Sequence, residues 1–67
     1  MIRLEKERTD KKLSKNRLAL DSHVDISYIS YAEKRGFQLY DPQLERLAES
    51  LGYTGDPHEL LEKVNER

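Results

Sequence analysis

The chain contains no cysteine and no tryptophan, and its 67 residues include only two prolines and three glycines. Without cysteine, neither disulfide bonds nor thiolate metal sites can form. The two histidines are isolated in the sequence, so we expect no metal site and no cofactor. The longest apolar run is Leu18-Ala19-Leu20, which is too short for a membrane span or a signal-peptide core. These absences predict a soluble, cytoplasmic protein with no membrane contact.

The charged residues are abundant but unevenly distributed. They make up 37% of the chain, and the formal net charge is only -1. Residues 1–35 contain nine Lys or Arg and six Asp or Glu, a net of +3, whereas residues 36–67 contain three and seven, a net of -4. The N-terminal half could therefore face a polyanion, although a mixed, solvated surface explains the same numbers equally well. A chain of this length forms one small domain at most.

Apolar spacing and capping residues predict five short helices and no strand. The expected helices cover residues 2–8, 15–22, 26–34, a segment from Asp41-Pro42 to Gly52, and about ten residues after Asp56-Pro57. Ser14 and Asp25 are expected N-caps, and Asp41 is expected to cap the fourth helix. The segment 37–40 is interpreted as an ordered loop. Together these elements predict an all-α, compact domain.

The most informative stretch is the helical pair around residues 15–33. Two short helices joined by the corner Ser22-His23-Val24-Asp25 form a unit that proteins use to bind DNA. Residues 14–33, SKNRLALDSHVDISYISYAE, resemble the helix-turn-helix of the phage repressor/Cro-like (XRE) family. The similarity rests on Leu18-Ala19, Ser22, Val24, Ser27-Tyr28-Ile29-Ser30 and Glu33, and it extends to Arg8, Leu13-Ser14, Asp41-Pro42 and the Leu44–Gly52 pattern.

This resemblance, over roughly residues 2–53, implies a five-helix, lambda-repressor-like DNA-binding domain spanning residues 1–67. It implies a transcription regulator of bacterial, phage or mobile-element origin that binds double-stranded DNA as a homodimer. The base-facing positions that it implies are Asp25, Ile26, Ser27 and Tyr31. The residues assigned to the DNA backbone, some by resemblance and some as basic residues of the rim, are Lys15, Asn16, Arg17, Tyr28, Ser30, Lys34 and Arg35. Arg8 and Glu33 correspond to a structural salt bridge between the first and third helices.

Three features depart from the family pattern. His23 occupies a corner position where the family usually has glycine, and histidine tolerates a positive φ better than most residues. Glu7 replaces a usual leucine, so the first helix is expected to pack loosely. The loop 34–40 is longer and more apolar than is typical. The expected recognition helix, residues 26–34, also lacks Arg, Lys, Asn and Gln between Asp25 and Glu33. This predicts modest sequence specificity and a DNA affinity that falls steeply as salt rises.

Other interpretations remain open at this point. Ile26, Tyr28 and Tyr31 could be packing residues, and Phe37–Tyr40 could cap the core or bind a protein partner. The helix-turn-helix could also be a protein-interaction module, resembling an antitoxin or an anti-repressor, with little DNA affinity. The sequence contains no nucleophile–base pair, metal cluster or phosphate loop, so we do not expect an enzyme.

Overall fold

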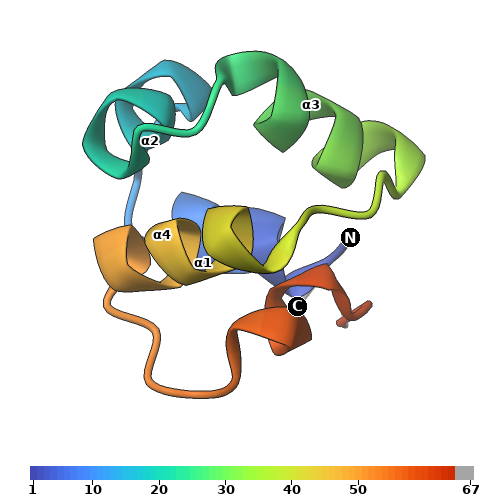
Figure 1. Ribbon diagram of the computed structural model, residues 1–67. Helices are drawn as coiled ribbons and strands as arrows, with labels where there is room; N and C mark the ends of the chain where they lie inside the picture. Colours follow the sequence, from blue (N-terminus) through green and yellow to red (C-terminus); the bar gives the residue numbers. More distant parts are fainter. Residues whose placement is uncertain (65–67) are drawn as a thin grey trace.

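A computed structural model describes residues 1–64 as four α-helices and one short 3₁₀ helix (Figure 1). The elements are α1 (Arg3–Asp10), α2 (Lys15–Ser22), α3 (Ile26–Arg35), α4 (Asp41–Leu51) and η1 (Pro57–Leu61). The described residues form no strand, only an isolated antiparallel bridge between Ile2 and Lys63. The all-α prediction is therefore confirmed. None of the helices within residues 1–64 has the length and apolar character needed to cross a membrane.

The helices enclose one core. Helix α2 packs against α3 and α4, and η1 packs against α4 and α1. Figure 1 shows α3 along one face of the molecule, with the loop 52–56 on the opposite face. The largest fully buried side chains are Leu4, Leu18, Ile29, Leu39, Leu44, Leu47, Leu51 and Leu60. Every helix thus contributes to a core made mainly of leucine.

The predicted N-caps of α2 and α3 are confirmed, and α3 extends to Arg35, one residue beyond its expected end. The Ser14 hydroxyl accepts a hydrogen bond from the Arg17 amide at 3.0 Å. The Asp25 carboxylate accepts one from the Ser27 amide at 2.8 Å. Helix α3 ends at Gly36 in the left-handed conformation, with φ of 67°. These contacts satisfy backbone groups that helix termini otherwise leave unpaired.

Two predictions at other helix ends are wrong. Asp41 is the first residue of α4, and Tyr40, in an extended conformation, is its N-cap. The Gln43 side chain accepts a hydrogen bond from the Tyr40 amide at 3.0 Å and so stabilises this helix start. The expected final helix of about ten residues is instead the five-residue η1, so residues 1–64 contain four α-helices and not five. The part of that expected helix beyond residue 64 lies outside the described residues.

The end of η1 is explained by pairing with the N-terminal segment. The Glu62 carbonyl accepts from the Arg3 amide at 2.8 Å, and the Val64 amide donates to the Met1 carbonyl at 2.9 Å. Backbone groups that a longer helix would use internally are therefore bonded to a distant part of the chain.

The segment 37–40 is a loop, as predicted, and its residues have two different roles. Leu39 is only 2% exposed and covers the core, whereas Tyr40 is 68% exposed. Phe37 is partly exposed and lies against α3. The loop therefore combines a core cap with exposed aromatic surface.

Candidate nucleic-acid interface

The corner between α2 and α3 is held by its own backbone and one buried hydroxyl. Ser22 is buried, and its hydroxyl donates to the Leu18 carbonyl at 2.7 Å and accepts from the Val24 amide at 3.3 Å. His23 adopts the left-handed conformation, with φ of 59°. Val24 then inserts into the core with 3% exposure. These contacts determine the direction in which α3 leaves α2.

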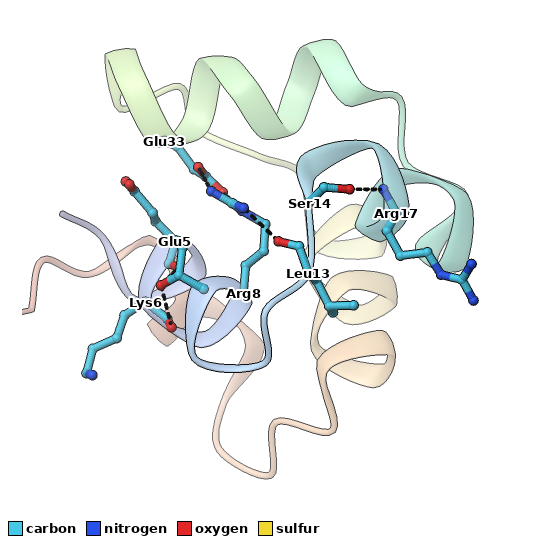
Figure 2. A network of polar contacts seen from close by, with 8 residues as sticks. Glu5, Lys6, Arg8, Leu13, Ser14, Arg17 and Glu33 are labelled. Atoms are coloured by element: carbon cyan, nitrogen blue, oxygen red, sulfur yellow. Dashed lines mark hydrogen bonds and ion pairs between the residues drawn. The ribbon is translucent and has the colours of Figure 1, made fainter.

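A bidentate ion pair joins α3 to α1, as Figure 2 shows. Arg8 Nε and Nη2 donate to the two carboxylate oxygens of Glu33 at 2.9 and 3.0 Å. The third nitrogen, Nη1, donates to the Leu13 carbonyl at 2.8 Å. The two charged side chains are 11% and 2% exposed, and the hydrogen bond to Glu33 raises the pKa of Arg8. This is the pair that the family resemblance implied, and it anchors the inner side of α3.

The remaining side of α3 faces outward. Ile29 and Ala32 are fully buried, whereas Ser27, Tyr31 and Lys34 are exposed. Since residues three and four positions apart share a helix face, these three form one line along the outer surface. Ile26 lies in the first turn of α3 and is 37% exposed. The exposed side of α3 therefore contains both polar side chains, Ser27 and Lys34, and large side chains with apolar area, Ile26 and Tyr31.

An aromatic cluster, defined here as Tyr28, Tyr31 and Phe37, lies beside this line. The ring centroids of Tyr28 and Phe37 are 5.9 Å apart, and those of Tyr31 and Phe37 are 6.5 Å apart in an edge-to-face arrangement. The Arg35 guanidinium lies 5.6 Å from the Tyr31 ring centroid. Such ring–ring and cation–ring contacts are favourable. Tyr31, Arg35 and Phe37 together line an open hollow of about 400 Å³.

Several residues with expected DNA contacts also have partners within the chain. The Asp25 carboxylate is engaged in capping α3, so part of its negative charge is directed toward the helix amides. Arg17 pairs with Asp21 at 3.3 Å. Ser30 is half-buried. The Arg35 side chain lies over the Tyr31 ring, and Arg35 is exposed to solvent.

The cations expected at the rim have different degrees of exposure. Lys34 is exposed at the last turn of α3, and Lys15 is half-buried at the start of α2. Asn16 is exposed one residue further along. Lys11 and Lys12 are exposed in the turn after α1. Exposed cations are thus present at the end of α3 and in the turn that precedes α2.

Sequence reasoning did not identify the packing of Phe37 on α3. The left-handed turn at Gly36 returns the chain, and the Phe37 amide donates to the Tyr31 carbonyl at 3.3 Å. A glycine C-cap followed by an aromatic residue was the available signal. The hydrogen bond from Arg8 to the Leu13 carbonyl was not predicted either, because every residue has a backbone carbonyl and the sequence does not show which one is used.

Among residues 1–64, no three side chains of the metal-ligating types lie close enough together to hold an ion. Comparisons with known protein families, with curated proteins and with solved structures found no match.

Proposed function

We propose that the protein is a DNA-binding transcription regulator that inserts α3 into the major groove of double-stranded DNA. The observation that carries the proposal is the outward line of Ser27, Tyr31 and Lys34, opposite an inner side fixed by the Arg8–Glu33 ion pair. A recognition helix needs an exposed face and a fixed orientation relative to the rest of the domain. The capped, three-residue connection His23–Asp25 between α2 and α3 is as short as such units require.

The cations around α3 support binding to a polyanion. Lys34 and Arg35 close the helix, and Lys15 begins α2. In this proposal they contact phosphates, which supply affinity without sequence information. A module this small seldom binds tightly alone, so the proposal includes a homodimer on a palindromic site in the cytoplasm of a bacterium, or of a cell that carries the phage or mobile element.

The test is a titration of a fluorescent DNA duplex at two salt concentrations. Binding should weaken steeply as salt rises. Lys15→Ala should weaken binding to all sequences and reduce the slope of log affinity against log salt by about 0.9, the value for one phosphate contact. The matched control is Lys6→Ala, which also removes one lysine. Figure 2 shows that Lys6 points away from α3, so this variant should bind as the parent does. Absence of binding at low salt would reject the proposal.

A second candidate is a protein-interaction module resembling an antitoxin or an anti-repressor. The observations in its favour are the partly exposed aromatic cluster and the exposed Tyr40, which lies in the same loop as Phe37. Exposed aromatic side chains are enriched at protein interfaces. This candidate predicts no salt-dependent duplex binding, and the same titration therefore separates the two functions.

A further inference from the structure

The outer surface of α3 offers unusual chemistry for contacting bases. Bidentate recognition of guanine uses Arg or Lys, and recognition of adenine uses Asn or Gln. Residues 26–33 include none of these four types. Besides the exposed Ser27 and Lys34, the helix exposes large side chains that include the aliphatic Ile26 and the ring of Tyr31, which are 37% and 47% exposed.

Only one group in the major groove is apolar, namely the C5-methyl of thymine. An exposed aliphatic or aromatic side chain gains by contacting it, because the contact removes apolar area from water. The other base edges present hydrogen-bonding groups, which such side chains leave unpaired. The exposed apolar groups of α3, such as Ile26 and the Tyr31 ring, therefore match thymine better than any other base.

Tyr31 is held ready for such a contact. The Phe37 and Tyr31 rings are in an edge-to-face arrangement with centroids 6.5 Å apart, and the Arg35 guanidinium lies 5.6 Å from the Tyr31 ring centroid. Phe37 is itself supported by Tyr28. A ring restrained in the free protein loses little side-chain entropy on binding.

The charges around Tyr31 favour DNA over an apolar protein surface as the occupant. Lys34 and Arg35 follow Tyr31 on the same helix, and both are exposed. The acidic residues nearest to it along the chain are Glu33, whose side chain is buried and paired with Arg8, and the cap Asp25, whose carboxylate is bonded to the Ser27 amide. Two cations beside an apolar contact point fit a methyl group flanked by phosphates.

We propose that Ile26 and Tyr31 select thymine by contacting its C5-methyl group in the major groove, with Phe37 as a positioning residue for Tyr31. The inference rests on the proposed function and specifies its substrate as duplex DNA with thymine at defined positions. It assigns sequence preference to apolar contacts and affinity to the surrounding cations.

The experiment begins with selection of duplexes from a random pool by the full chain. The enriched duplex is then synthesised again with deoxyuridine in place of each thymine in turn, which removes only the methyl group and preserves base pairing. Affinity should fall about fourfold at each contacted thymine, the equivalent of the ~0.8 kcal/mol gained by burying one methyl-sized group. Deoxyuridine outside the bound region is the matched DNA control and should change nothing.

Variants assign the effect to residues. Tyr31→Ala should abolish the response to deoxyuridine at one position, and Ile26→Ala at another, whereas Tyr31→Phe should retain it because the ring remains. Phe37→Ala should reduce the response at the Tyr31 position without removing it. Leu20→Ala truncates an apolar side chain on α2 that is 72% exposed, and it should leave every response intact. Circular dichroism verifies that each variant is folded.

The outcomes are distinguishable. If no duplex binds even at low salt, the proposed function fails and this inference fails with it. If duplexes bind but deoxyuridine changes affinity at no position, thymine selection is overturned while DNA binding stands. This comparison uses the unmodified chain, so it remains decisive even if a variant unfolds. Unchanged responses in both Ile26→Ala and Tyr31→Ala would overturn the assignment to these residues.

Discussion

At the residue scale, the Arg8–Glu33 pair links the stability of the domain to the position of its candidate reading helix. Both side chains are almost completely buried, and all three guanidinium nitrogens of Arg8 have acceptors. Removing one member of a buried pair leaves the other charge without a partner, which costs more than the pair itself contributes. The consequence is large for a domain this small, because small domains have little stability to lose.

We predict that Arg8→Ala lowers the free energy of unfolding by about 3 kcal/mol, measured by urea denaturation. The double variant Arg8→Met/Glu33→Leu should recover most of that loss, because neither charge is then buried. Lys6→Ala breaks the exposed pair with Asp10 and should change stability by less than ~0.5 kcal/mol. A loss below ~1 kcal/mol in Arg8→Ala would show that the pair does not hold α3 on α1.

His58 connects two elements through a titratable contact. Its Nε2 lies 2.7 Å from the carboxylate of Asp41 at the start of α4, and its Nδ1 lies 2.9 Å from that of Asp56. The bond to Asp41 and, next, the bond to Asp56 raise the pKa of His58 above its ordinary 6.5. The backbone and side-chain bonds from His58 lower the pKa of Asp56 below 3.8. This contact was not predicted from sequence, because residues 41 and 58 meet only through the fold.

The contact predicts how stability depends on pH. Because folding raises the pKa of His58, its contribution is fully present below pH 6.5 and is lost as the pH rises through the higher folded-state value. The contribution of Asp56 is present above pH 3.8 and is lost as the pH falls through its lower folded-state value. The melting temperature of the parent should therefore exceed that of His58→Gln at pH 5.5 by more than it does at pH 8.5.

Nuclear magnetic resonance gives a direct check of this contact. The His58 imidazole should titrate above 6.5, and Asp41→Asn should bring its pKa back toward that value. A His58 pKa at or below 6.5 in the parent chain would contradict the bridging geometry.

At the scale of the elements, the positions of α2 and α3 in the sequence could be predicted from local capping and spacing rules. The contacts between segments distant in the sequence could not. The ends of α2 and α3 depend on Ser14, Asp25 and Gly36, whose capping preferences act within four residues. The end of η1 depends on hydrogen bonds to residues 1–3, some sixty positions away. The outward residues of α3 could be assigned from helix spacing, whereas the aromatic cluster depends on how Gly36 returns the chain toward Tyr31.

Helices α2 and α3 both end at a residue in the left-handed conformation, which is a histidine in α2 and a glycine in α3. Substituting each residue tests the energetic cost of this conformation. His23 has φ of 59° and Gly36 has φ of 67°. His23→Gly should stabilise the domain by about 0.5 kcal/mol or more, because glycine adopts this conformation without steric cost. Gly36→Ala should destabilise it by about 1 kcal/mol, although a methyl group there would meet no atom within 4 Å. Thermal unfolding of both variants measures the difference, and equal signs would contradict the backbone explanation.

At the scale of the whole molecule, the charge asymmetry of the sequence follows the arrangement of the helices. The nine basic residues of positions 1–35 belong to the part of the chain that contains α1, α2 and α3. The segment with α4 and η1 is predominantly acidic, and its loop 52–56 lies on the face opposite α3 (Figure 1). The proposed approach of DNA along α3 would therefore bring it to the part of the chain that carries the net positive charge.

The measurement that tests the DNA-binding account most directly is a map of backbone amide signals during titration with duplex DNA at low salt. If α3 enters the major groove, the signals that shift should belong to α3, the start of α2 and residues 36–37, and raising the salt should reverse the shifts. Signals from the loop 52–56 should stay in place. If no amide shifts, or if the shifts gather around α4 and η1, α3 is not the element that contacts DNA.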